Sequence, residues 1–83
     1  MQKYTKLYLE TYNYDEFSVV PCEICGNKAT EIHHIKGRLG NNLLDIYNLI
    51  AVCRKCHEKY GQRRQYIKWL LYLIKKKLKS WEN

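Results

Sequence analysis

Two Cys-x-x-Cys pairs bracket the stretch that decides the fold, CEICGNKATEIHHIKGRLGNNLLDIYNLIAVCRKCHEK, residues 22–59. Each pair can present two sulfurs from one tight turn, and four thiolates form the tetrahedral shell that structural zinc prefers. Gly26 follows the first pair, where a residue that tolerates a left-handed backbone is useful. The sequence therefore predicts one structural Zn²⁺ held by four cysteines: Cys22, Cys25, Cys53 and Cys56.

Disulfides and a redox-active pair are weaker interpretations of the same cysteines. Disulfides are typical of secreted chains, and residues 1–6 lead into no apolar signal region. Neither pair lies in the strand-helix context of a thioredoxin-like redox site. Zinc would also supply the staple that an 83-residue chain needs, because so short a chain buries little apolar surface. We therefore expect a cytoplasmic protein with neither a signal peptide nor a transmembrane segment.

The segment between and after the cysteine pairs predicts two strands and a helix. Residues 30–35 contain β-branched side chains and predict a short strand. Residues 36–42 are rich in turn-forming residues, and residues 49–53 predict a second, apolar strand. A helix is expected to begin near Arg54 and to be broken at Gly61.

Helices are also predicted at both ends of the chain. The apolar side chains of residues 3–12 and of the C-terminal segment recur at helical spacing. Residues 66–74 are apolar nearly all the way round, so this helix is expected to cross the core, to form a homodimer seam, or to lie on a membrane surface, in that order. The prediction is a single small α+β domain over residues 1–83, with an N-terminal helix and connector (1–21), a zinc-stapled core (22–60) and a basic and apolar C-terminal helix (62–83).

Positive charge is concentrated in the last third of the chain. The formal net charge is +7, yet residues 1–53 carry five Lys and Arg against six Asp and Glu, whereas residues 54–83 carry ten against two. This balance favours a polyanionic partner, and no apolar run is long enough to span a membrane, so we expect DNA binding and no stable membrane association. Lys55, Lys59 and Arg63 would share one helical face if the helix continued past Gly61. The side chains expected to contact phosphates are Arg38, Arg54, Lys55, Lys59, Arg63 and Arg64.

Several short motifs follow one another in a recognisable order. They are Cys22-x-x-Cys25, EIHHI (31–35), NLIAVC (48–53) and CHEK (56–59). In these residues, and in the predicted order of strand, loop, strand and helix, the chain resembles the HNH endonuclease family over residues 22 to about 60. The resemblance implies a ββα-metal fold and metal-dependent hydrolysis of DNA phosphodiester bonds.

The resemblance also implies roles for individual residues. His33 would be a ligand of one catalytic divalent ion and His57 the second ligand, while His34 would be the general base. Asn48 would pin the loop and orient the base, since an amide can donate and accept hydrogen bonds at once. A division of labour between His33 and His34 agrees with the opposite orientation of neighbouring side chains on a strand, and imidazole has a suitable pKa for a base.

One departure from the family bears on the catalytic metal. Some members carry a third metal-binding His one helical turn after the second ligand, where this chain has Gly61. Two protein ligands leave open positions that suit Mg²⁺ or Mn²⁺, although imidazoles also suit Zn²⁺ or Ni²⁺. Asp45 is a candidate for an additional oxygen ligand, and Glu31 is expected to be an exposed strand residue.

Two classes of function remain open at the level of sequence. The favoured one is a metal-dependent DNA endonuclease with weak sequence preference, which nicks one strand or cuts both. The other is a non-catalytic zinc-containing module that binds nucleic acid, or a subunit of a larger phage-type DNA-processing complex. A non-catalytic zinc module would have no use for His34 and Asn48.

Overall fold

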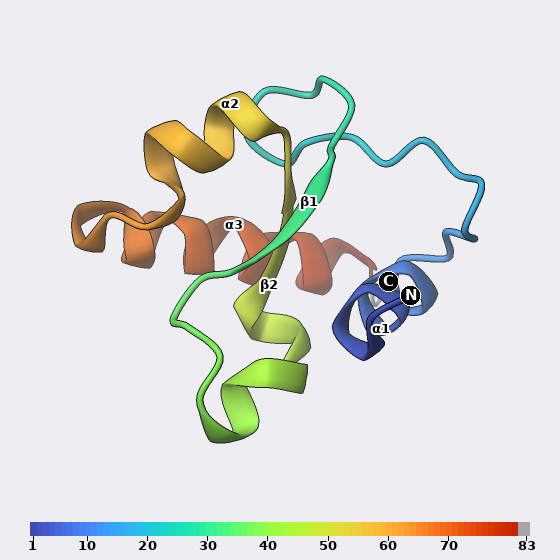
Figure 1. The fold of residues 1–83 in the computed structure, drawn as a ribbon, viewed down its shortest axis with the longest axis horizontal. Helices are drawn as coiled ribbons and strands as arrows, with labels where there is room; N and C mark the ends of the chain where they lie inside the picture. The colour runs from blue at the N-terminus through green and yellow to red at the C-terminus, as the bar shows by residue number, and fades with distance from the viewer. Residues whose placement is uncertain (82–83) are drawn as a thin grey trace.

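A computed structural model describes residues 1–81 of the chain and shows a two-stranded sheet flanked by helices (Figure 1). β1 (Glu31–His34) and β2 (Leu49–Val52) pair antiparallel, so that Glu31 lies opposite Val52 and His34 opposite Leu49. β2 is buried along its whole length, because helices and loops cover both of its faces. The predicted α+β architecture, with two strands and flanking helices, is confirmed.

Helical segments account for most of the remaining regular structure. α2 (Arg54–Cys56) passes directly into η3 (His57–Gly61), a turn of π-helix. Short 3₁₀ turns lie before β2 and before the last helix. Their bounds, with those of the two longer helices, are α1 (Lys3–Thr11), η1 (Gly40–Leu44), η2 (Ile46–Asn48), η4 (Arg64–Tyr66) and α3 (Ile67–Trp81).

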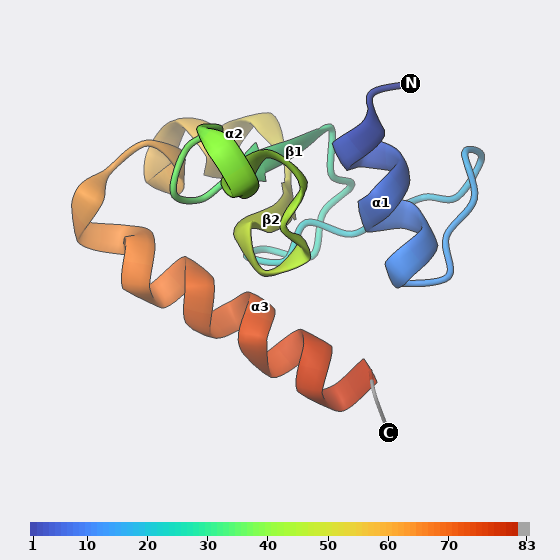
Figure 2. The ribbon, with the colours of Figure 1, turned by 90° about the horizontal axis from the view of Figure 1, so that it is seen from below.

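The C-terminal helix α3 completes the core of the chain itself. Leu70, Ile74 and Leu78 recur at intervals of four, so they form one stripe, and all three are buried. Figure 2 shows α3 running beneath the sheet, with α1 to one side. Of the three placements considered for this helix, the core is the one that the structure shows. None of the helices within residues 1–81 is both long and apolar enough to cross a membrane.

Contacts near the end of α3 join it to the first cysteine turn and to α1. Lys77 Nζ lies 2.9 Å from the carboxylate of Glu23, and both side chains are mostly buried. The same ammonium lies 4.7 Å from the ring centroid of Tyr12, which also contacts the ring of Trp81 at 5.9 Å. The C-terminal helix α3 therefore contacts both the first cysteine turn and the residue that follows α1.

The start of the last helix differs from the prediction. α3 begins at Ile67 rather than Gln62, because the backbone leaves the helical region at Gln62 (φ −113°) and Arg63 (φ −110°, ψ 122°). The condition under which Lys55, Lys59 and Arg63 would share one helical face, a helix that continues past Gly61, is therefore not met. The last two residues of the predicted helix, 82–83, lie outside the described residues.

Candidate active site

The four cysteines lie together at one end of the sheet. Their Sγ atoms all lie within 4.8 Å of one another, and Cys25 Sγ is 3.7 Å from Cys53 Sγ. A tetrahedral zinc with bonds of about 2.3 Å requires sulfurs about 3.8 Å apart. Gly26, with a φ of 81°, closes the first turn by donating its N–H to the carbonyl of Cys22 at 2.9 Å. The cluster therefore fits a metal ion, and four thiolates are typical of structural zinc.

The ionisation of these thiols also favours a bound cation. Burial alone would raise the pKa of Cys22, but hydrogen bonds with the surrounding backbone lower it to about 7. The pKa of Cys56 is raised, first by burial and then by the neighbouring sulfurs. A thiolate at one cysteine thus disfavours ionisation of the next by charge repulsion, and a bound divalent cation would offset that repulsion.

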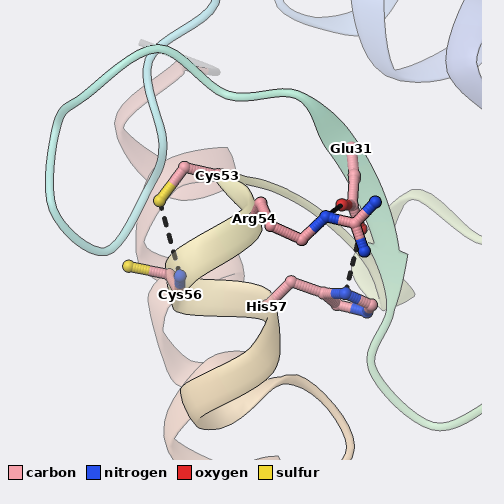
Figure 3. Close-up of polar contacts among 5 residues, drawn as sticks. All are labelled: Glu31, Cys53, Arg54, Cys56 and His57. Atoms are coloured by element: carbon pink, nitrogen blue, oxygen red, sulfur yellow. Dashed lines mark hydrogen bonds and ion pairs between the residues drawn. The ribbon is translucent and has the colours of Figure 1, made fainter.

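The short helix formed by α2 and η3 connects the cysteine cluster to a second group of residues. Figure 3 shows Cys56 and His57 leaving opposite sides of this helix. The backbone N–H of Cys56 donates to Cys53 Sγ at 3.4 Å, while Nδ1 of His57 lies 2.9 Å from Oε2 of Glu31. Neighbouring residues of one helix therefore serve two different centres.

Glu31 orients His57. Its carboxylate can only accept when ionised, so Nδ1 of His57 is the donor in this contact, and the tautomer with the proton on Nδ1 has its lone pair on Nε2. Arg54 Nε, 3.1 Å from the other carboxylate oxygen, holds Glu31 in place (Figure 3). This is the arrangement of a metal-binding histidine supported by a carboxylate. The expectation that Glu31 is simply an exposed strand residue is therefore wrong, and its side chain is only 25% exposed.

His33 lies beside His57. The two rings meet edge to face with centroids 4.9 Å apart, and Nε2 of His33 is buried with no hydrogen-bond partner among residues 1–81. Burial, followed by the nearby His57, lowers the pKa of His33 to about 4, so the imidazole is neutral at pH 7. Two adjacent imidazole rings, one with a buried nitrogen that has no partner in residues 1–81, are donors of the kind that a divalent metal takes.

His34, the last residue of β1, has different neighbours. Its Nε2 lies 3.1 Å from the carbonyl of Leu43, and because a carbonyl only accepts, Nε2 carries the proton. Nδ1 then bears the lone pair, and no hydrogen-bond partner for it occurs in the described part of the chain. Burial lowers the pKa of His34, against the Leu43 contact and with help from Arg38. The residue is a neutral imidazole that can accept a proton.

Asn48 holds the loop that follows β1. It is fully buried, and its Nδ2 donates to the carbonyls of Gly37 at 3.0 Å and Asn42 at 2.9 Å. Its Oδ1 accepts from the N–H of Lys36 at 2.7 Å. The side chain therefore fixes both ends of a loop, residues 36–42, that would otherwise have few backbone partners.

A pocket of about 650 Å³ brings the three histidines together. Arg38 and Arg64 belong to its lining, and both side chains are exposed enough to meet an anion. Asp45, the candidate oxygen ligand, instead accepts from the N–H of Tyr47 at 3.0 Å and is absent from the pocket lining within residues 1–81. Four of the proposed phosphate contacts also lie outside that lining, namely Arg54, Lys55, Lys59 and Arg63.

Gly61 has no side chain, and this absence makes room for the ring of His57. A Cβ built at this position would lie 2.6 Å from Cδ2 of His57, which is closer than real contacts allow. The bare α-carbon therefore leaves room for the His57 ring. A third histidine at position 61 could not be accommodated without moving His57.

One residue of the site was missed by sequence reasoning. Tyr4, on α1, lines the pocket and meets His34 edge to face, with ring centroids 4.5 Å apart. The guanidinium of Arg38 lies 5.1 Å above the same Tyr4 ring. In the sequence, Tyr4 is simply one of several apolar residues on a helical face, so no local signal distinguishes it.

Comparison with known proteins identifies one family. A family model described as HNH endonuclease matches residues 22–63, from the first cysteine to just beyond η3. No curated protein and no solved structure gives a significant match.

Proposed function

The chain belongs to the HNH endonuclease family, whose match covers half of its length, and we propose that it is a metal-dependent endonuclease that hydrolyses DNA. Family membership makes a nuclease or a nucleic-acid-binding role its class of function. The observation that carries the proposal is His34, a neutral imidazole whose Nδ1 has no hydrogen-bond partner in residues 1–81. It shares a pocket with His33 and His57.

His34 is the proposed general base. Its Nδ1 takes a proton from the attacking water, while the Leu43 carbonyl holds Nε2 and thereby fixes the tautomer. The lowered pKa of His34 keeps the imidazole in the form that can accept a proton at physiological pH. The edge contact with Tyr4 limits rotation of the ring.

His33 and His57 are the proposed ligands of one divalent ion. When bound, that ion stabilises the charge that develops on the phosphate and the leaving oxygen. Glu31 orients His57 for this task, and burial keeps His33 neutral. Mg²⁺ or Mn²⁺ is the proposed ion because two protein ligands leave positions open, and Zn²⁺ or Ni²⁺ is the alternative that imidazole donors allow.

Arg38 and Arg64 are the proposed contacts for the phosphates on either side of the cleaved bond. They reach the pocket lining from different elements, one from the loop after β1 and one from η4. Phosphate contacts carry no sequence information, so weak sequence preference is expected. The apolar stripe of α3 is used in the chain's own core, which favours a monomer that nicks one strand. The exposed basic residues proposed to contact more distant phosphates are Arg54, Lys55, Lys59 and Arg63.

The test is a nicking assay on supercoiled DNA with zinc-loaded protein and added Mg²⁺ or Mn²⁺. We expect open circles to accumulate only with the added ion, and His34→Ala to abolish them while the protein stays folded with one zinc. Glu16→Ala, an exposed change far along the connector, is the control and should nick normally. Unaltered nicking by His34→Ala would remove the general-base assignment.

Metal stoichiometry separates the enzyme from the non-catalytic alternative. The nuclease requires a second, weaker site that EDTA empties before the zinc, and His57→Ala should weaken it. A zinc module that only binds nucleic acid would hold a single tight zinc. It would also bind DNA equally well after His34→Ala and show no nicking with either protein.

A further inference from the structure

The chain passes from η3 to α3 at the left-hand end of the ribbon in Figure 1. Three aromatic side chains of this stretch, Tyr60, Tyr66 and Trp69, form a cluster. The ring centroids of Tyr60 and Tyr66 are 4.9 Å apart, those of Tyr60 and Trp69 5.2 Å, and those of Tyr66 and Trp69 6.2 Å. The cluster is not closed off from solvent, since Trp69 is 38% exposed. An indole in this position offers a surface that a planar ligand can reach.

The aromatic cluster belongs to a stretch of chain that also supplies lining residues to the pocket containing the histidines. Gly61, Arg64 and Ile67 line that pocket, and each is next to, or two residues from, a member of the cluster. The lining residues and the aromatic residues thus come from the same short stretch of chain. A nucleic-acid strand with one phosphate at the histidines would place a neighbouring nucleotide near these rings.

The charge around the cluster matches such a strand. Residues 59–69 contain four basic residues and no acidic one. Lys59 Nζ lies 5.2 Å from the ring centroid of Tyr60, and Arg63, Arg64 and Lys68 are exposed. Basic side chains that hold the backbone, together with aromatic rings on which bases stack, are the combination used to bind single strands.

We infer that Tyr60, Tyr66 and Trp69 form a stacking subsite for an unpaired base next to the cleaved phosphate. Duplex DNA hides its base faces, so the subsite selects single-stranded, frayed or branched DNA. The location beside a cleaved bond rests on the proposed function, but base stacking itself is a binding property. It can therefore be measured without cleavage.

The test compares two oligonucleotides that differ only in their bases, a short oligothymidylate and an abasic strand with the same number of phosphates. Both are titrated into zinc-loaded His34→Ala protein without added divalent ion, and affinity is measured by fluorescence anisotropy. Stacking predicts that the abasic strand binds about 5- to 100-fold more weakly. Trp69→Leu should abolish the difference, and Trp69→Phe, which keeps a ring in the cluster, should retain part of it.

Tyr72→Leu is the matched control, because Tyr72 is an aromatic residue of the same helix, 58% exposed and outside the three-ring cluster. It should leave the discrimination between the two strands unchanged. If the His34→Ala protein with Tyr60, Tyr66 and Trp69 intact binds both strands with equal affinity, the stacking subsite is overturned. Phosphate contacts alone would then account for binding. Tighter binding to anionic lipid vesicles than to oligothymidylate would also overturn it. If the His34→Ala protein discriminates between the strands but the unaltered protein with Mg²⁺ or Mn²⁺ does not nick DNA, the result counts against the proposed function alone.

Discussion

The cysteine cluster and the histidine pocket share one short helix, yet they are built in different ways. Cys56 and His57 are adjacent, and each supplies a side chain to a different centre. The cluster takes all four of its donors from two tight turns. The pocket draws its parts from α1, β1, the following loop, η3 and η4. The comparison suggests that the first centre maintains the fold and that the second depends on a fold already formed.

The largest expected effect comes from substituting Cys56, and its neighbour His57 provides the comparison. Cys56→Ser should unfold the protein, because zinc bound by four thiolates contributes about 10–16 kcal/mol, which is at least the whole stability of a small domain. His57→Ala should remain folded with one zinc and lose only the weaker metal site. Circular dichroism and zinc content measure both variants. A folded Cys56→Ser protein would contradict the role of the cysteine cluster in maintaining the fold. A His57→Ala protein without zinc would show that the two centres are not independent.

A smaller effect is expected from Asn48→Ala, at the residue that holds the loop after β1. The change removes three hydrogen bonds from a fully buried side chain and leaves the loop carbonyls unpaired, which should cost about 2–4 kcal/mol. Asn41→Ala makes the same chemical change at an exposed position and should cost little. Chemical unfolding of zinc-loaded protein measures both. Equal stability of the two variants would show that the loop does not depend on Asn48.

The sequence predicted the two regions to different extents for a physical reason. Cys-x-x-Cys spacing is local, so the zinc ligands could be identified from the chain alone. The contact between Glu31 and His57 could not be identified in this way, because it depends on the antiparallel register and on where α2 starts. The start of α3 was missed because the turn after Gly61 is extended at Arg63. Single-sequence periodicity does not report such a change of backbone.

The interaction between Glu31 and His57 can be tested without disturbing the zinc. Glu31→Gln keeps an acceptor oxygen but loses the charge that fixes the imidazole, so Mn²⁺ affinity at the histidine site should fall about 10- to 100-fold. Zinc content should stay at one ion. Glu58→Gln, an exposed change in η3, is the matched control. Titration calorimetry with Mn²⁺ on zinc-loaded protein gives the comparison, and unchanged affinity in Glu31→Gln would show that His57 needs no orienting carboxylate.

The smallest expected effect tests whether a pocket residue outside the segment matched by the family contributes to catalysis. Tyr4 comes from α1, and its ring contacts both the imidazole of His34 and the guanidinium of Arg38. An edge-to-face contact is worth about 0.5–1.5 kcal/mol, so Tyr4→Leu should lower kcat for nicking several-fold to about tenfold. Tyr4→Phe keeps the ring edge and should retain most of the rate.

Separate values of kcat and KM on supercoiled DNA distinguish positioning from support of the fold. Loss of His34 orientation lowers kcat with an unchanged midpoint of thermal unfolding, whereas loss of packing lowers that midpoint. Weaker contact of Arg38 with phosphate would appear in KM. If Tyr4→Phe is as slow as Tyr4→Leu, the ring edge is not what holds His34. The N-terminal helix would then be a support for the fold and no part of the site.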